Sequence, residues 1–407
     1  MKWLLFAWRN VLRNKRRTII TSGIICIGTV ALLVTVGFVL ATFHGLREVT
    51  IHTELGHIQV ANGGYFDAFE ERVMQYGLTE EDVKKIDSVL KDQQHVRFSM
   101  CRINFEGLIS TGERTVAVMG QGVEPSKEVK LSSIFIQINE GQSLTDNEDD
   151  QYQIVLAAGL AKNLGAKINQ NITLLATTED GIINALDLRV VGTYSTGVPE
   201  QDKHSVMVPM GITKILLRTQ KVSKIIVALD RTEYTTTIIS KLKQHLPNKD
   251  IRSWSDLAFY YQRVVTLYRN VFSIMGTIIL LVVLLSSVNS MLMNIMERVR
   301  EVGTMRSMGI SIYQITKIFL LEGALIGLLG SIAGIILGII GSLTINLMEI
   351  KMAPPPGRNT PYPLIIMMSF DYYFFVTLIM VALSSIAAWL PTRRVIKMKI
   401  VDALGHN

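Results

Sequence analysis

The hydrophobic positions of this chain gather into four long apolar blocks, at residues 18–43, 271–296, 318–347 and 372–390. A helix of about 20 mainly apolar residues is long enough to cross the roughly 30 Å of hydrocarbon in a bilayer. Each block meets that length, and the charged runs of the chain lie between and beside the blocks. The pattern predicts a membrane protein with four transmembrane α-helices.

Residues 44–266, between the first and second blocks, have a mixed pattern that predicts a large α+β domain inserted between helices one and two. Short β-rich runs predict strands at 56–60, 97–109, 114–122, 153–156, 171–176, 186–191, 205–208, 224–229 and 251–254, and helical patterns lie at 79–93, 158–164 and 235–245. Thr79 and Asp82 have the spacing of a capping box. The helical stretches at 44–55 and 255–267 are predicted to be stalks that lead out of and back into the membrane.

The polar residues of this domain show no pattern of metal ligands. The acidic run at 146–150 lacks the spaced ligands and the glycine of a calcium loop, so we expect a solvated loop. His52, His57 and His204 lie far apart in the sequence, and we expect each to be an ordinary polar residue. No metal and no cofactor is expected in this chain.

The basic residues predict how the chain is oriented in the membrane. Residues 1–17, 297–306 and 391–399 are rich in Lys and Arg, and such residues favour the cytoplasmic side. Both termini, including the tail at 391–407, are therefore expected in the cytoplasm. Residues 44–266 and the loop at 348–371, which contains a helix-breaking PPPG at 354–357, are expected outside. Orientation explains the net charge of +7 without a nucleic-acid partner.

Residues 1–17 alternate basic and apolar positions at helical spacing, which predicts an amphipathic helix on the cytoplasmic membrane surface. A cleaved signal peptide is the alternative, because such a peptide also begins with a basic region and an apolar run. The apolar block at 18–43 is too long for a signal peptide and lacks a small-x-small cleavage site. We therefore expect these residues to stay attached as helix and first span.

A short charged helix is predicted at 297–312, between the second and third spans. It is too polar for hydrocarbon and too short to be a domain, so it suits a helix that lies along the membrane surface and that another protein pushes. Its charges would pair with a groove of the partner, and Val302 and Met305 would fill an apolar pocket there. The alternative is a surface loop that obeys the positive-inside rule. The residues assigned to this contact are Glu297, Arg298, Arg300, Glu301, Val302, Gly303, Met305 and Arg306.

The third span carries six glycines, spaced four, three, four, four and three residues apart, which places them on one helix face: Gly323, Gly327, Gly330, Gly334, Gly338 and Gly341. Small residues at this spacing let two helix backbones approach closely in lipid. A loose glycine-rich linker is the alternative, and the Ile and Leu residues between the glycines argue against it. Glu322 lies within the same span, so it is either functional or held in a structural contact.

The sequence lacks the motifs of a nucleotide-hydrolysing or acyl-transferring enzyme. It contains no G-x-x-x-x-G-K-[ST] loop to hold a phosphate and no G-x-S-x-G nucleophile motif. The two cysteines, Cys26 and Cys101, lie in a span and in the large domain, so no disulfide is expected. Energy from ATP would have to come from a separate chain, with ATP-Mg bound by that partner.

Three segments give the chain a family resemblance: RNVLRNKRRTIITSGIICIG at the first span, MLMNIMERVREVGTMRSMGISIYQITKIFLLEG at the second and third, and PTRRVIKMKIVDAL at the end. With the large domain between spans one and two, the chain resembles the permeases of the MacB/LolC–LolE/FtsX group of ABC systems, of the mechanotransmission type. GHIQVANGGY and VLAAGLAKNLGAKINQNITLL are similar to the lipoprotein-releasing LolC/LolE-like members.

The resemblance implies a non-catalytic permease subunit in the bacterial inner membrane. It implies that 297–312 is a coupling helix and that the 44–266 domain is periplasmic, with Porter-like and Sabre-like parts. The implied partners are two copies of an ABC ATPase subunit, a second permease copy in a homodimer or heterodimer, membrane lipids, and a periplasmic lipoprotein carrier or an adaptor. Lipoproteins or other lipid-anchored molecules are the implied cargo. The alternatives are tripartite efflux of a small molecule or peptide and FtsX-like signalling to a cell-wall hydrolase.

Overall fold

The computed structural model of the chain describes residues 2–67, 75–132, 137–146, 152–353, 362–396 and 398. Three sequence-based predictions fall outside these residues in whole or in large part: the acidic run at 146–150, the PPPG at 354–357 and the tail at 391–407. The chain divides into two compact units. One is helical and comprises Met1–His44, Val264–Met352 and Pro363–Asn407, and the other is mixed and comprises Gly45–Arg263 and Ala353–Tyr362.

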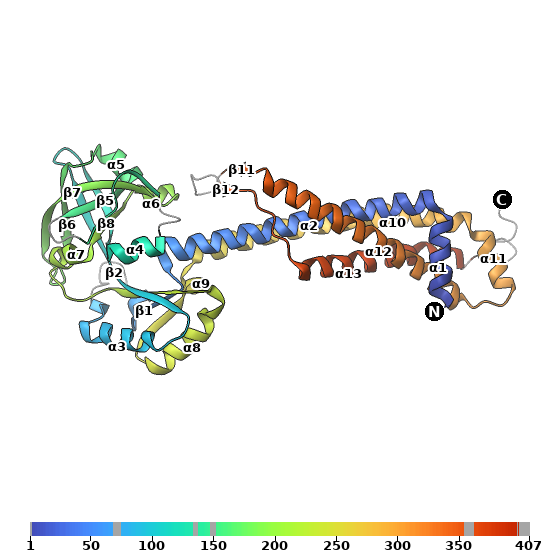
Figure 1. Cartoon of the computed structure of the whole chain (residues 1–407), viewed down its shortest axis with the longest axis horizontal. Helices are drawn as coiled ribbons and strands as arrows, with labels where there is room; N and C mark the ends of the chain where they lie inside the picture. Colours follow the sequence, from blue (N-terminus) through green and yellow to red (C-terminus); the bar gives the residue numbers. More distant parts are fainter. Residues whose placement is uncertain are drawn as a thin grey trace. The chain divides into compact units, whose positions relative to one another are not determined.

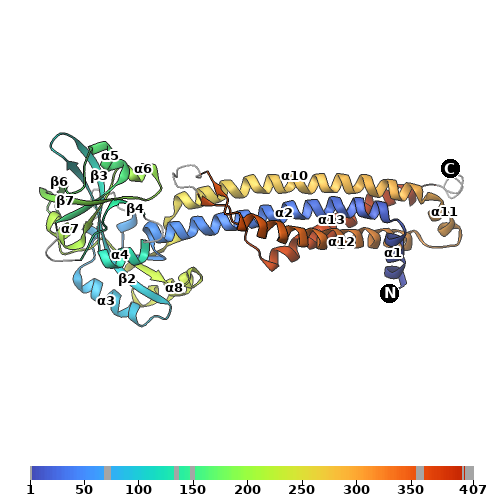
Figure 2. The same cartoon turned by 45° about the horizontal axis from the view of Figure 1, so that its top comes forward.

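The helical unit is built mainly from long helices that pack along one another (Figure 1 and Figure 2). The helices that contribute to it are α1 (Lys2–Arg13), α2 (Lys15–Thr50), α10 (Phe259–Glu297), α11 (Val299–Ser307), α12 (Ile312–Leu347) and α13 (Phe370–Ile396), and the short strands β11 (Lys351–Met352) and β12 (Tyr362–Pro363) lie between α12 and α13 in the chain. Four of these helices, α2, α10, α12 and α13, are long and apolar enough to cross a membrane. The prediction of four candidate spans is confirmed.

Each long helix extends beyond the apolar block that predicted it. The fourth block ends at residue 390, whereas α13 continues through Pro391 to Ile396. Proline lacks the N–H that would bond to the carbonyl four residues earlier, so α13 continues past Pro391 without that hydrogen bond. Pro391 and Thr392 are both buried against the rest of the unit, and the Thr392 hydroxyl donates to the Ala388 carbonyl at 2.6 Å. α13 therefore extends beyond the predicted span at 372–390, whose limits in the membrane stay a prediction.

The mixed unit contains a ten-stranded sheet whose main path runs β10-β1-β9-β2-β3-β8-β5-β7-β4, with β6 pairing β2 and β7. The strands are β1 (Ile58–Asn62), β2 (Val96–Ser110), β3 (Thr115–Val123), β4 (Gln137–Gly141), β5 (Gln153–Ala157), β6 (Asn171–Thr177), β7 (Ile183–Ser195), β8 (Ser205–Pro209), β9 (Lys224–Leu229) and β10 (Lys249–Ser253). Most neighbours are antiparallel, but β3–β8 and β5–β7 are parallel pairs. This is the α+β architecture that the sequence predicted.

Short helices complete the mixed unit: η1 (Ile51–Leu55), η2 (Tyr65–Asp67), α3 (Glu80–Lys91), α4 (Pro125–Ser132), α5 (Ala158–Leu164), α6 (Pro199–Asp202), α7 (Met210–Leu217), η5 (Thr232–Tyr234), α8 (Thr235–His245) and α9 (Trp254–Leu257). The predicted capping box at α3 is confirmed, with Thr79 and Asp82 bonding each other's backbone. α4 and α7 were not predicted. The α7 sequence MGITKILL also resembles a buried strand.

The core of the mixed unit lies between the sheet and its covering helices. It includes fully buried Ile58, Ile103, Leu156 and Leu216. The turn from η1 into β1 requires Gly56, which has a φ of 63° and lies so near Ile226 that a Cβ would collide with it.

Candidate functional site

The short helix α11 is separated from the long helices on both sides by breaks in the backbone. α10 ends at Glu297, and Arg298 then adopts φ −105° and ψ 13°, so α11 begins on a new axis at Val299. Gly309, with a φ of 84°, turns the chain after α11. Ser311 and Gln314 then form a capping box that starts α12. The segment predicted at 297–312 is thus a nine-residue helix with defined turns at both ends.

The inner face of α11 is apolar and packs onto the ends of α12 and α13. Val299 and Val302 are each 1% exposed. They belong to a cluster with Ile295, Ile315, Phe319, Val395 and Ile396. Burying a branched aliphatic side chain contributes about 1.5–3 kcal/mol. The cluster therefore holds α11 firmly against the spans it connects.

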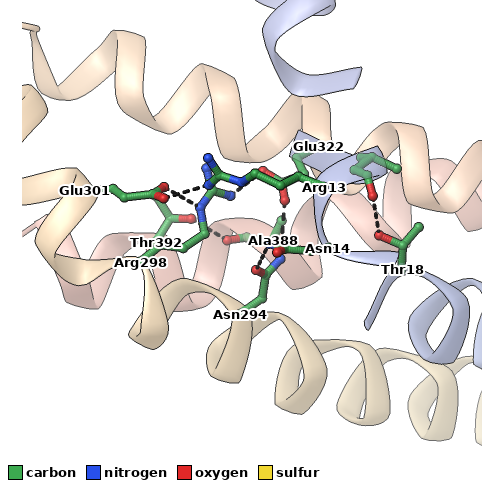
Figure 3. A network of polar contacts seen from close by, with 10 residues as sticks. Arg13, Asn14, Thr18, Asn294, Arg298, Glu301, Glu322, Ala388 and Thr392 are labelled. Carbon is green, nitrogen blue, oxygen red and sulfur yellow. Dashed lines mark hydrogen bonds and ion pairs between the residues drawn. The ribbon is translucent and has the colours of Figure 1, made fainter. Parts of the chain in front are cut away.

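A buried ion pair joins the start of α11 to the third span. The Arg298 Nη1 donates to Glu322 Oε2 at 2.8 Å, and the two side chains are 6% and 2% exposed (Figure 3). The guanidinium also lies over the Phe319 ring, 5.1 Å from its centroid. Charges that are removed from solvent in this way need close partners to be tolerated. Glu322 is therefore held in a structural contact, one of the two roles that its position in the sequence left open.

Further polar residues extend this ion pair into a network that reaches α1 and α2 (Figure 3). The Asn294 amide donates to Glu322 Oε1 at 3.3 Å and accepts from the Asn14 amide at 3.4 Å. Glu301 accepts from Arg298 Nε at 2.9 Å and from Arg13 at 2.6 Å. Burial alone would raise the pKa of the Glu301 carboxyl, but the bonds from Arg298 and Arg13 hold it below its usual value.

Two more arginines make contacts near the ends of α11. Arg306 donates to the carbonyls of Ile396 at 3.1 Å and Met398 at 2.6 Å, which ties the end of α11 to the end of α13. Arg17 of α2 pairs with Glu297 at the end of α10. Arg306 therefore acts within the chain, and so does the Arg298 side chain.

The face of α11 opposite its buried residues is exposed. Arg300, Thr304, Ser307 and Met308 are exposed, and they follow one another at helical spacing. Met308 is 68% exposed. The Arg300 side chain makes no hydrogen bond or ion pair with any other residue that the structure describes. We call Arg300, Thr304, Ser307 and Met308 the outer face of α11.

The structure corrects part of the sequence-based assignment. Val302 was expected to fill an apolar pocket in a partner, but it is buried within its own chain, as is Gly303. Met305 is half-buried against the same apolar cluster. Thr304 and Met308, which were not singled out, lie on the exposed side. The signal that could have found them is the helical period itself: positions 299, 302 and 303 form one face, and 300, 304, 307 and 308 the other.

The glycines of α12 lie at two different helix contacts. A Cβ on Gly323 would lie 2.8 Å from Ala388 of α13, and one on Gly327 would lie 2.9 Å from Ser384. The Ser384 hydroxyl donates to the Gly323 carbonyl at 2.7 Å, which shows how closely the two backbones approach.

The next two glycines face α2. A Cβ on Gly330 would lie 2.8 Å from the Ile25 Cβ, and one on Gly334 would lie 2.6 Å from the Thr29 Cβ. Gly338 leaves ordinary space beside Leu33, at 3.4 Å, and no atom lies within 4 Å of a Cβ on Gly341. Gly341 therefore makes no close helix contact with the residues that the structure describes, and its packing role stays a prediction.

Within the described residues, no group of three or more His, Cys, Asp or Glu side chains is placed to hold a metal ion. The structure instead shows a short polar helix, α11, between long helices that are candidates to span the membrane. Apolar packing and a buried ion pair hold this helix against them. These features define the class: a multi-span membrane protein with a large mixed domain inserted after its first span.

Comparison with known families identifies the chain more closely. Residues 18–245 match the model of the MacB-like periplasmic core domain, and residues 273–400 match the FtsX-like permease C-terminal region. The chain belongs to the family of ABC transporter permeases that combine a MacB-like periplasmic core domain with an FtsX-like C-terminal region. The predicted family is confirmed.

Individual relatives are distant. The lipoprotein-releasing system transmembrane protein LolC of Neisseria meningitidis serogroup B is 24% identical over 355 residues, which cover 83% of this chain and 81% of the relative. LolE of Haemophilus influenzae is 25% identical over 253 residues, 60% of each chain. Among solved structures, the periplasmic region of MacB from Actinobacillus actinomycetemcomitans matches with a TM-score of 0.37 and 15% identity, covering 51% of this chain and 92% of that one.

Proposed function

We propose that this permease couples ATP hydrolysis by a separate ATPase subunit to motions of its MacB-like domain, and thereby releases lipoproteins or other lipid-anchored cargo from the inner membrane. The observation that carries the proposal is the construction of α11. Its inner face, Arg298 and Arg306 bind it to α12 and α13, while no residue that the structure describes covers its outer face. A force on the outer face would therefore move the spans rather than bend a loop.

The ATPase partner would contact the outer face of α11. A mixed surface of a cation, two hydroxyls and an exposed methionine suits a polar groove with an apolar centre, since Met adapts its shape readily to a partner. The ATP-Mg complex would be held by that partner, because this sequence contains no phosphate-binding loop. Two ATPase copies and a second permease copy complete the proposed assembly.

The proposed orientation places α11 and both termini in the cytoplasm and the mixed domain in the periplasm. The arginines and lysines support this orientation. They are concentrated in and beside α1 and α11, and segments rich in these residues favour the cytoplasmic side of a membrane. Cysteines introduced at Asp146 and at His406 test it with an impermeant thiol reagent in intact cells. We expect labelling at 146 and none at 406, and the reverse pattern would overturn the orientation.

Lipid-anchored cargo is proposed because relatives that match 75–83% of this chain are named as lipoprotein-releasing proteins. Efflux of a small molecule or peptide through an adaptor is a second candidate, favoured by the match of residues 18–245 to a MacB-like domain. Proteoliposomes that contain the permease, its co-purified ATPase and both a fluorescent lipopeptide and a soluble peptide would separate them. ATP-dependent release of the lipopeptide alone supports the first proposal, and export of the soluble peptide alone refutes it.

Charge reversal at Arg300 tests the coupling step. Placing a reversed charge in an interface costs about 2–5 kcal/mol, enough to lose a partner of ordinary affinity. Arg300→Glu should therefore abolish ATPase binding and stimulation while the chain still inserts and folds. Lys317→Glu is the matched control, because Lys317 is also an exposed cation, on α12. Normal ATPase stimulation in Arg300→Glu, or an equal loss in Lys317→Glu, would contradict the role given to the outer face of α11.

A further inference from the structure

A cavity in the mixed unit lies apart from α11 and the glycine contacts. It has a volume of about 450 Å³, is partly open, and is lined by residues of α4 and of strands β3, β4, β5, β7 and β8. This volume lies within the range of pockets that hold small molecules, about 300–1,000 Å³. Its walls are mainly aliphatic and include Val123, Val129, Ile138, Leu144, Val155 and Met207.

One charged side chain also lines the cavity. Glu128 of α4 is 5% exposed, and its Oε2 accepts a hydrogen bond from the fully buried Arg102 of β2 at 2.5 Å. Its Oε1 has no hydrogen-bond partner among the residues that the structure describes. A buried acceptor without a partner costs about 1–3 kcal/mol or more when it is charged, so such groups are uncommon unless they have a purpose.

The lining defines the chemistry of an occupant. Arg102 already neutralises Glu128, so the cavity offers a hydrogen-bond acceptor rather than a net negative charge. Among the lining residues that the structure describes, Tyr194 is the one aromatic, and aliphatic side chains form most of the remainder. A neutral donor such as a hydroxyl or amide would satisfy Oε1 once the carboxylate turns toward the cavity, and an aliphatic chain would fill the apolar part.

We propose that this cavity binds a small amphiphile with one aliphatic chain and a neutral hydrogen-bond-donating head. Val129, which is 45% exposed on α4, stands at the edge of the cavity and marks where the chain enters. α4 also contacts η1, the π-helical turn that follows α2. Only α4 would therefore separate the occupant from that turn. The argument for this site rests on the cavity and not on the cargo proposed above.

The test uses the full chain in lipid nanodiscs and a dodecanol that carries a photoactivatable diazirine. Labelled peptides are mapped by mass spectrometry. We expect saturable labelling of peptides that contain α4 and β4. The methyl ether of the same probe lacks the donor and should label at least about tenfold less, since a hydrogen bond to a charged group contributes about 1.5–3 kcal/mol. Equal labelling by alcohol and ether would overturn the role of Glu128.

Two tryptophan variants locate the site without disturbing the buried ion pair. Val129→Trp should block the cavity and reduce labelling at least about tenfold. Lys130→Trp adds the same bulk to the neighbouring exposed position, which does not line the cavity, and should leave labelling unchanged. Unchanged labelling in Val129→Trp, with both variants folded to the same melting temperature, would overturn the site.

Competition identifies the natural source of the amphiphile. A lysophospholipid that displaces the probe would assign a free membrane lipid, and a synthetic lipopeptide that displaces it would assign the chain of a lipid-anchored molecule. Either result supports the cavity as a binding site for this chemistry. Failure of both to compete, at concentrations where unlabelled dodecanol does, would contradict the proposal.

Discussion

The ion pair between Arg298 and Glu322 provides the strongest prediction about stability. Glu322→Gln keeps the size of the side chain and its contact with Asn294 but leaves the Arg298 guanidinium in a site where it is only 6% exposed. Removing one partner of a buried pair typically costs about 3–5 kcal/mol, because the other charge stays buried without compensation. Glu301 still bonds Arg298 at 2.9 Å, so we expect a value near the lower limit, about 3 kcal/mol.

This cost can be measured as a shift in melting temperature of the purified protein. For a unit of about 150–250 residues, 1 kcal/mol corresponds to roughly 2–4 °C, so Glu322→Gln should melt about 6–12 °C lower. Arg298→Met should have a similar effect, because it leaves Glu322 unpaired. The double variant Arg298→Met with Glu322→Leu removes both charges and should recover most of the loss, since apolar replacement of a whole buried pair is often neutral.

The two single variants and the double variant form a double-mutant cycle, which measures the interaction between the two side chains. A double variant that melts as low as the sum of the two single losses would show that the side chains do not act as a pair. Single variants that melt within 2 °C of the unaltered chain would refute the assignment of a buried, energetically coupled ion pair.

Two further predictions concern the glycine contacts and a buried histidine. Gly334→Leu should lower the folded yield and melting temperature far more than Ile332→Leu, whose side chain is exposed, and equal tolerance would contradict close packing at Gly334. Burial, together with the charge of His52, lowers the pKa of His57 from its ordinary 6.5 to about 4. The unfolded chain therefore binds more protons between these values, so the mixed unit should be most stable above pH 6.5 and lose stability as the pH falls toward 4. Pulse proteolysis in urea should show this loss of stability at low pH. His57→Asn keeps an acceptor for the Leu229 N–H and should make the loss smaller. A pH dependence that is the same in His57→Asn would refute the role given to His57.

The sequence could predict the elements whose pattern either extends over many residues or depends only on residues close together in the chain. Four apolar blocks, the alternation along the strands and the Thr79 capping box each depend on neighbouring residues, and they agree with the structure. The family also follows from segments at the spans.

The parts that escaped prediction depend on contacts between distant residues. Glu322 was recognisable as an unusual acid in a span, but nothing in the sequence indicates that Arg298, 24 positions earlier, is its partner. The six glycines share a regular spacing, yet only the packing of α2 and α13 decides that Gly323 and Gly334 are tight contacts and Gly341 is open. Likewise, charge alone suggested that Arg298 and Arg306 face a partner, whereas burial shows that both are bonded within the chain.

The central claim is that the outer face of α11 contacts an ATPase subunit, and site-specific photocrosslinking tests it most directly. A benzophenone amino acid is placed at Thr304, on that face, and as a control at Leu347, which is 82% exposed at the other end of α12. Both positions are exposed, so neither change should disturb folding. We predict a crosslink to the ATPase subunit from position 304 and none from 347. A crosslink from 347 alone, or no crosslink from 304 in an assembly that hydrolyses ATP, would contradict the account.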